Sequence, residues 1–152
     1  MTKRVKVPFI KQSPLVPMVR IFLPGGTAGW AIVDTGSEST LVDKEFVKNN
    51  KELFKTEHTR DKINFIGIDS KSSSPHPIVN LEGSIAFYQD QKEIFFHKIE
   101  AILSDLSTVS GYTKQNYGVE PSAILGSDFL QTIHAEVNYP EQAMYIDDGI
   151  SG

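Results

Sequence analysis

Short runs of apolar and β-branched residues alternate with turn-forming residues along most of this chain. Such runs, rich in Val, Ile, Phe and Tyr and bounded by Gly, Pro, Asn or Asp, are typical of β-strands. The pattern predicts seven strands, at residues 5–10, 18–23, 29–33, 63–68, 78–88, 94–103 and 143–146. The run Pro24-Gly25-Gly26 predicts a turn between the second and third strands.

Two segments have the spacing of amphipathic helices. The first covers residues 43–54, with Asp43 as its N-cap, and its inward face would carry Phe46, Val47, Asn50 and Phe54. The second covers residues 127–134 and would be capped by Ser127, with Phe129, Leu130 and Ile133 facing inward. The polar segments 69–77 and 104–122 are predicted to be loops. Many short strands with two short helices favour a mainly β domain, either a barrel or a folded-over sheet.

The composition of the chain excludes several classes of protein and of functional site. A length of 152 residues fits one domain, and an apolar content of 39% is enough for a hydrophobic core. The net charge of −4 argues against a nucleic-acid-binding protein, because such proteins usually carry a basic excess. The absence of cysteine excludes disulfides, thiolate metal sites and cysteine nucleophiles. The histidines do not have the spacing of a metal site, so no metal or cofactor is expected.

The charge is unevenly distributed along the chain. Residues 1–99 carry a net charge of +3 and residues 100–152 a net charge of −7. The split is either a chance distribution of solvated charge or a sign that the two ends of the chain pair with each other.

The basic N-terminus is not followed by an apolar run long enough to span a membrane. The best candidate, residues 15–23, is interrupted by Pro17 and Arg20. We therefore expect a soluble protein, with the cytoplasm favoured as its compartment if the N-terminus is native.

The run WAIVDTGSESTLV at residues 30–42 carries the first candidate chemistry. An apolar strand leads into Asp34, and Thr35, Gly36 and Ser37 follow before the chain becomes apolar again. Ionising an acid at the end of a buried strand is costly without nearby hydrogen-bond donors. The backbone N–H groups and hydroxyls of the next three residues supply such donors. Taken alone, the tripeptide Asp-Thr-Gly fits an Asx-type turn as well as a catalytic acid.

A second run, SAILGSDFL at residues 122–130, is an apolar strand that ends at Gly126 and opens a helix. Together with Asp34-Thr35-Gly36 and a closing strand after residue 135, it resembles the retropepsin-like aspartic proteases, the single-lobe family that includes the retroviral proteases. The resemblance covers about residues 15–147. It implies a mainly β, closed-barrel-like retropepsin fold with a flap hairpin and a short C-terminal helix, one lobe per chain, in a single domain over residues 1–152.

The resemblance also implies a homodimeric aspartic endopeptidase, because one chain carries a single Asp-Thr-Gly and the chemistry needs two carboxylates. The two copies of Asp34 would share a proton and activate a water that attacks a peptide bond in a peptide or protein substrate. Thr35 would brace the two active-site loops, and Gly36 would donate a backbone hydrogen bond. Ser37 would donate to the outer carboxylate oxygen, and Gly126 would support the site from the second run.

The remaining residues implied by the resemblance would bind the substrate. The set comprises Ile32, Glu38, Leu41 and Ile124 beside the acid, and Ile66, Gly67 and Ile68 in a flap that extends from about residue 66 to residue 77. For any single isoleucine, plain core packing is an equally good interpretation. The chain departs from the viral members because its segments 44–62 and 104–122 are longer, its flap has one glycine, and Ser127 replaces a basic residue.

The resemblance places the chain ends at the dimer interface. The N- and C-terminal segments would interleave between subunits, with opposite charges facing each other and Val5, Val7, Tyr145 and Ile146 supplying apolar contacts. Removing residues 1–7 would then weaken the dimer more than the monomer.

Two other interpretations stay open. One is a retropepsin-like domain that binds peptides or dimerises with weak or absent proteolysis, which the intact Asp34-Thr35-Gly36 disfavours. The other is an unrelated β-barrel binding module, which the run ending at Gly126 disfavours.

Overall fold

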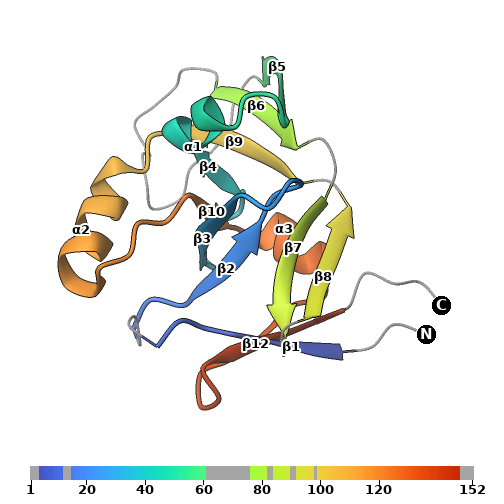
Figure 1. Cartoon of the computed structure of the whole chain (residues 1–152), viewed down its shortest axis with the longest axis vertical. Helices are drawn as coiled ribbons and strands as arrows, with labels where there is room; N and C mark the ends of the chain where they lie inside the picture. Colours follow the sequence, from blue (N-terminus) through green and yellow to red (C-terminus); the bar gives the residue numbers. More distant parts are fainter. Residues whose placement is uncertain are drawn as a thin grey trace.

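The computed structural model describes residues 4–11, 15–60, 76–81, 84–89, 92–97 and 99–147, with residues 56–60, 76–77, 84, 88–89 and 92–97 described by their backbone alone. The strand predicted at residues 63–68 and most of the predicted flap lie outside the described residues. The described part of the chain is mainly β, as the sequence predicts, and its strands form one large folded sheet and one small sheet (Figure 1).

The large sheet has nine strands in the order β5-β6-β9-β4-β10-β3-β2-β7-β8. In chain order, these strands are β2 (Met18–Phe22), β3 (Ala28–Val33), β4 (Leu41–Asp43), β5 (Phe54–Arg60), β6 (His76–Leu81), β7 (Ser84–Gln89), β8 (Lys92–His97), β9 (Glu100–Ser104) and β10 (Ala123–Leu125). Most neighbours are antiparallel, but β10 runs parallel to β3 and β4 runs parallel to β9. The parallel pairing of β3 with β10 brings the ends of two distant runs, near residues 34 and 126, to the same end of the sheet.

Three helices occur in the described part of the chain. Helix α1 (Lys44–Asn49) begins after Asp43, whose carboxylate accepts a hydrogen bond from the Glu45 N–H, so the predicted N-cap is confirmed. Helix α3 (Ser127–Thr132) buries Phe129, Leu130 and the following Ile133, as predicted, but its N-cap is Gly126 and not Ser127. Helix α2 (Ser107–Tyr117) stands where a loop is predicted.

Besides the N-cap of α3, four predictions about secondary structure are wrong. The helix predicted over residues 43–54 ends at Asn49, and Phe54 instead begins β5. The segment 78–88 contains parts of two strands, because β6 pairs with β5 and β9 whereas β7 pairs with β2 and β8. The segment 94–103 likewise divides between β8 and β9. Apolar alternation continues across both junctions and therefore does not reveal the change of partner. Helix α2 escapes prediction because the inward side chains on it include polar Ser110 and Thr113.

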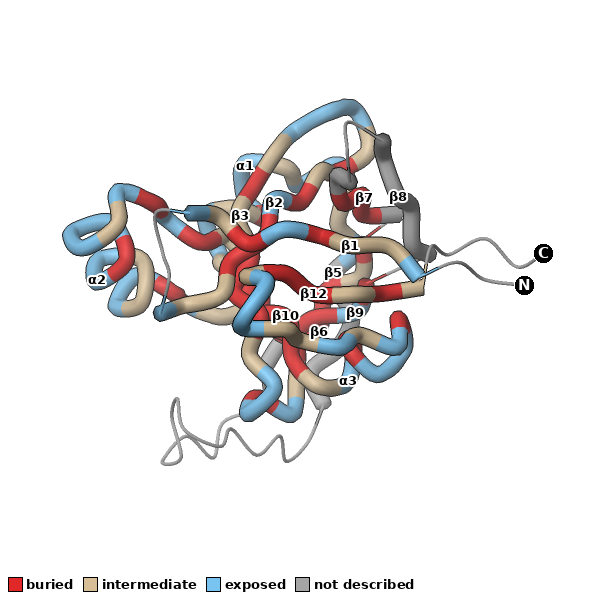
Figure 2. Tube along the Cα trace, turned by 90° about the horizontal axis from the view of Figure 1, so that it is seen from below, coloured by how far each residue is buried: buried red, intermediate tan, exposed pale blue. Residues whose placement is uncertain are grey.

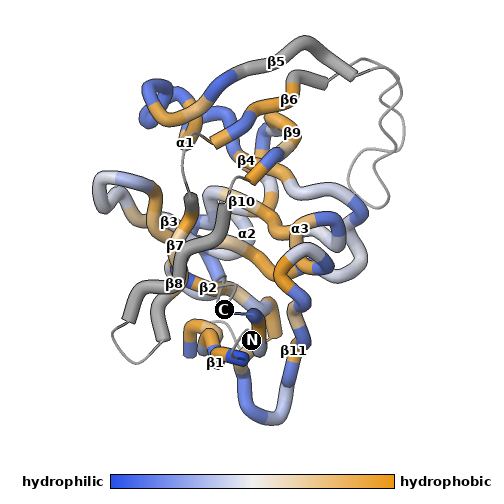
Figure 3. The backbone as a smooth tube through the Cα atoms, turned by 90° about the vertical axis from the view of Figure 1, so that its right-hand side faces the viewer, coloured by the Kyte–Doolittle hydropathy of each residue, from blue (hydrophilic) through white to orange (hydrophobic). Residues whose placement is uncertain are grey.

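Alternation along the central strands divides the buried side chains between two clusters, one on each face of the sheet. Ala31, Val33, Val42, Ala123 and Leu125 belong to the main core. Ile32, Leu41 and Ile124 belong to a second cluster on the opposite face. Figure 2 shows the buried positions concentrated in these strands, and Figure 3 shows hydrophobic residues gathered along β6, β9 and β10.

The small sheet contains the two ends of the described chain, in the order β1-β12-β11. Strand β1 (Arg4–Pro8) pairs antiparallel with β12 (Ala143–Asp147), which pairs with β11 (Glu136–Asn138). Arg4 lies opposite Asp147 with 3.1 Å between the charged atoms, and the Lys6 ammonium lies 3.3 Å from the Glu141 carboxylate. The pairing of the chain ends that the charge distribution indicated is therefore present, within a single chain.

This intramolecular pairing corrects the expected source of dimer contacts. Val7 and Ile146 are 2% and 0% exposed in one chain and belong to its own core, so they cannot supply apolar surface to a second copy. Loss of residues 1–7 would remove most of β1 and one of these core side chains. We therefore expect such a deletion to destabilise the monomer itself.

Candidate active site

Asp34 lies directly after β3, where the backbone of β10 holds it in place. The Asp34 N–H donates to the Leu125 carbonyl across 3.1 Å, which extends the parallel pairing of β3 and β10 by one residue. The side chain of Asp34 is half-buried, whereas Thr35 and Gly36 are exposed. The strand thus presents a carboxylate at its end, accessible from outside yet fixed by the sheet.

The loop after Asp34 folds back on the carboxylate. The Gly36 N–H donates to Asp34 Oδ1 across 2.9 Å, and the Ser37 N–H donates to the Asp34 carbonyl across 3.2 Å. A Cβ at position 36 would lie 3.3 Å from the same Oδ1, so glycine leaves the carboxylate room to approach the backbone. The backbone hydrogen bond that the resemblance implied for Gly36 is present in this geometry.

Ser37 makes a different contact from the one expected. Its hydroxyl donates to the Ser39 carbonyl across 2.7 Å, and the residue is only 7% exposed. The side chain therefore stabilises the return of the loop toward β4. The expected hydrogen bond from this hydroxyl to the outer oxygen of Asp34 is replaced by this local one.

Gly126 lies where the run of residues 122–130 packs against the loop that follows Asp34. The Gly126 N–H donates to Thr40 Oγ1 across 3.0 Å, and the Ser127 N–H donates to the Ser37 carbonyl across 2.7 Å. A Cβ at position 126 would lie 2.4 Å from the Ser39 carbonyl oxygen, closer than real Cβ atoms approach. Only glycine fits between these two backbones without a shift of the backbone.

Asp128 joins the same two segments, and sequence reasoning missed it. Its Oδ1 accepts from the Thr40 hydroxyl across 2.7 Å and its Oδ2 accepts from the Thr40 N–H across 3.2 Å. Thr40 is fully buried, so these bonds satisfy polar groups that water cannot reach. An acid in the first turn of a helix was the available signal, but it does not identify a partner 88 residues away.

The predicted substrate-binding residues divide into three groups. Ile32, Leu41 and Ile124 are side by side in adjacent strands but only 8%, 0% and 3% exposed. Glu38 is exposed beside the loop, and its carbonyl accepts from the Asp128 N–H across 3.2 Å. The flap residues Ile66, Gly67 and Ile68 lie outside the described residues.

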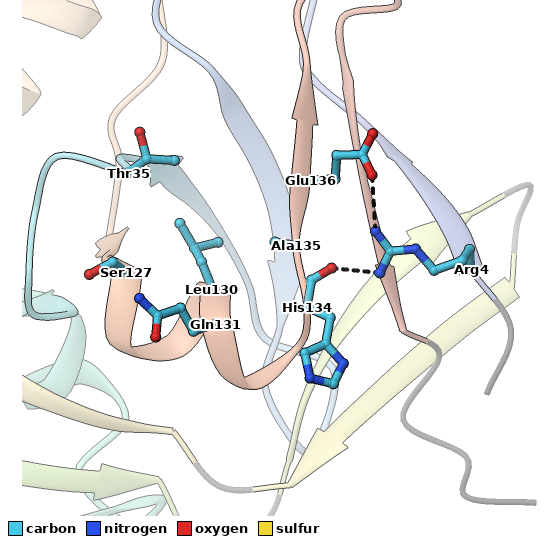
Figure 4. A pocket seen from close by; sticks show the side chains of 8 residues that line it. All are labelled: Arg4, Thr35, Ser127, Leu130, Gln131, His134, Ala135 and Glu136. Carbon is cyan, nitrogen blue, oxygen red and sulfur yellow. Dashed lines mark hydrogen bonds and ion pairs between the residues drawn. The ribbon is translucent and has the colours of Figure 1, made fainter. Parts of the chain in front are cut away.

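A depression of about 790 Å³ adjoins the loop at Thr35. Figure 4 shows its lining, with Thr35 on one side, α3 and the residues after it along the floor, and Arg4 at the far rim. The Arg4 guanidinium donates to the His134 carbonyl and lies 3.6 Å from the Glu136 carboxylate. Leu130 and Ala135 supply apolar surface between these polar groups.

Electrostatic interactions close to this depression stabilise the small sheet. The hydrogen bond with His134, followed by the interaction with Arg4, lowers the pKa of the Asp147 carboxyl. The hydroxyl of Tyr145 donates to Glu141, which lowers the pKa of the Glu141 carboxyl and raises the pKa of the Tyr145 phenol. Both carboxylates therefore favour the charged form that pairs with the basic side chains of β1.

The described residues contain no group of three or more His, Asp or Glu side chains arranged to hold a metal ion. No helix in the described part of the chain is both long and apolar enough to cross a membrane.

No family model and no curated protein matches this chain by sequence. The structure is similar to that of a retropepsin-like aspartic protease from Rickettsia conorii, with a TM-score of 0.52 and 10% identity over 97% of this chain and 92% of the other. The retroviral protease-like domain of Ddi1 from Leishmania major gives a TM-score of 0.49 and 13% identity, covering 86% of this chain and 87% of the other. The EIAV protease in complex with the inhibitor HBY-793 gives 0.44 and 14%, covering 81% of this chain and 92% of the other.

Proposed function

With the retropepsin-like fold as the premise, we propose that this chain is an aspartic endopeptidase that acts as a homodimer, with Asp34 as its catalytic residue. The observation that carries the proposal is the presentation of Asp34 at the end of β3, with its backbone bonded to β10 and its Oδ1 bonded to the Gly36 N–H. Such a carboxylate is positioned by rigid backbone and remains accessible from one side.

The chemistry requires a second carboxylate, and the chain contains one Asp-Thr-Gly. A second copy would supply it, so that two Asp34 side chains face each other and share one proton. The ionised carboxylate takes a proton from a bound water, and the protonated carboxyl polarises the scissile carbonyl. Water then attacks directly, without a covalent intermediate between enzyme and substrate.

The surface around Thr35 supports an approach of the second copy from that side. Thr35 and Gly36 are exposed next to Asp34, and the depression lined by Leu130, Ala135 and Glu136 continues from them. A twofold axis beside Thr35 would bring the two Asp34 carboxylates together and the two depressions into the same interface.

Activity should depend on pH in the way a shared proton requires. Hydrolysis should increase from neutral toward mildly acidic pH, where the pair holds one proton, and decrease again when both carboxyls are protonated. An optimum at alkaline pH would contradict a shared-proton pair.

Subunit mixing tests the requirement for two carboxylates. Wild-type chains are mixed with a tenfold excess of Asp34→Asn chains, with exchange confirmed by sedimentation, and peptide hydrolysis per wild-type chain is measured. Most wild-type chains would then have an inactive partner, so activity per wild-type chain should fall by about tenfold. Undiminished activity would show that one carboxylate is sufficient. The matched control is an equal excess of wild-type chains in place of the variant.

A further inference from the structure

A continuous row of apolar side chains crosses six strands of the large sheet on the face of Ile32. Cross-strand register places its members next to one another in the order Ile78, Ile102, Leu41, Ile124, Ile32 and Met18. We call this set the apolar row. Ile32 is two residues before Asp34, and alternate residues of a strand point to the same face. Ile32 therefore brings the apolar row beside the Asp34 carboxylate, where side chains of a bound peptide would lie.

The apolar row is covered and not open to a peptide. All six members are at most 8% exposed. Leu106 and Val119, which flank α2, are buried in the same cluster, and Val109 and Tyr117 of α2 pack against it. The other described residues that pack on it are Ile10, Val16 and Trp30. Helix α2 and its flanks thus pack into the same cluster as the apolar row.

Helix α2 has little intrinsic stability. Its first seven residues are Ser-Thr-Val-Ser-Gly-Tyr-Thr, all of low helix propensity, and it has no acidic residue in its first turn. Its N-cap, Leu106, makes no side-chain capping bond. A helix of this composition depends on its tertiary contacts, and segments of low local stability are the ones that open first.

The hydrogen bonds that anchor α2 to the rest of the chain lie in its first turn. The Leu106 N–H donates to the Asp43 carboxylate across 3.0 Å, and the Ser110 hydroxyl donates to the Pro121 carbonyl across 3.3 Å. Gly118 ends the helix in the left-handed conformation, with φ of 73°. The part of the helix after Ser110 is held by the packing of Thr113 and Tyr117, so unwinding it would withdraw Tyr117 from the cluster that contains the apolar row.

We propose that α2 is an autoinhibitory cover, which must unwind before the apolar side chains of a peptide can reach the apolar row beside Asp34. The inference rests on the proposed protease function and adds a regulatory step to the same site. A partner or modification that loosens α2 would activate the enzyme, and one that rigidifies α2 would inhibit it.

Two exposed positions allow the stability of α2 to be changed without touching the apolar row. Gly111 lies inside the helix, and a Cβ there would meet nothing within 4 Å, so Gly111→Ala stabilises the helical state. Gln115 is exposed, and Gln115→Gly destabilises that state. If α2 must unwind, kcat/KM for apolar peptides should fall by about 2- to 5-fold in the first variant and rise by about 2- to 3-fold in the second. The control is Asn49→Ala, which stabilises exposed helix α1 and should leave kcat/KM unchanged.

Hydrogen exchange tests the proposal that α2 is an autoinhibitory cover separately from the proposal that the chain is a protease. Amide exchange in residues 107–117 is measured in Asp34→Asn with and without an excess of an apolar octapeptide, and we expect the peptide to accelerate it. Unchanged or slower exchange, or equal kcat/KM in Gly111→Ala and Gln115→Gly, would overturn the cover and leave the protease function intact. Faster exchange with no hydrolysis by any variant would support the cover and refute the protease function.

Discussion

Replacement of Gly126 by alanine tests the close contact between the two runs that build the candidate site. The added Cβ would lie 2.4 Å from the Ser39 carbonyl oxygen, 2.5 Å from the Ser39 carbonyl carbon and 2.9 Å from the Ser37 oxygen, whereas ordinary contacts are 3.4–4 Å. The Ser39 backbone would have to retreat by about 1 Å. It cannot do so freely, because Ser127 and Thr40 hold the same loop by hydrogen bonds.

Overpacking of a well-packed site typically costs about 1–3 kcal/mol. Because the added methyl group would meet backbone atoms of both Ser37 and Ser39, we expect a cost at the upper end of this range, about 3 kcal/mol. For a protein of this size, that lowers Tm by about 6–12 °C. A displacement of about 1 Å next to Asp34 should also lower kcat/KM by about 100-fold.

Denaturant unfolding and peptide hydrolysis are measured together for Gly126→Ala and for Gly111→Ala. The second variant is the matched control for unfolding, since a Cβ at position 111 has open space. Its loss in kcat/KM, about 2- to 5-fold from stabilisation of α2, should stay far below the loss of about 100-fold expected for Gly126→Ala. A Gly126→Ala protein with unfolding free energy within about 0.5 kcal/mol of the wild type would refute the close contact. Loss of stability with undiminished hydrolysis would refute the link between this contact and the position of Asp34.

Three further predictions follow from other parts of the structure. Asp128→Ala removes the acceptor for the Thr40 hydroxyl and N–H, and should lower the unfolding free energy by about 1–2 kcal/mol in denaturant titrations, whereas Asp128→Asn should lose less. The lowered pKa of Asp147 stabilises the fold above its unfolded pKa of about 4, so stability should fall as the pH decreases below that value, and less steeply in Asp147→Asn. Deleting residues 1–8 removes β1 and buried Val7, and should lower monomer stability by at least about 3 kcal/mol, measured by unfolding at concentrations where no dimer sediments.

The sequence predicts the elements whose signals are local. The apolar strand before Asp34 and the apolar run before Gly126 are each contained in a few consecutive residues, and both fold as expected. Strand β4, Leu41–Asp43, has only two apolar residues before Asp43 and the helix that follows, which is too few for its alternation to be recognised. The helical pattern of α2 is hidden by its polar inward side chains.

Contacts between distant segments could not be predicted from the sequence. Ser37 is close to Asp34 in the sequence, which suggests a hydrogen bond from its hydroxyl to the Asp34 carboxylate. In the folded loop, the hydroxyl donates to the Ser39 carbonyl instead. The pairing of Asp128 with Thr40 depends on the parallel placement of β10 beside β3. Burial of Ile32 likewise depends on its packing with side chains from distant segments, which a pattern of isoleucines does not contain.

The most direct measurement of the central claim is cleavage of a mixed peptide library by the wild type and Asp34→Asn side by side at mildly acidic pH. Asparagine preserves the shape of the side chain and the acceptor for the Gly36 N–H, but it can neither take up nor release the proton. We expect cleavage by the wild type, next to apolar residues, and a loss in Asp34→Asn well beyond the ~10²–10⁴-fold typical of one proton-transfer group, since both carboxyls are removed. Cleavage at comparable rates by a folded Asp34→Asn protein would contradict the assignment of Asp34 as the catalytic acid.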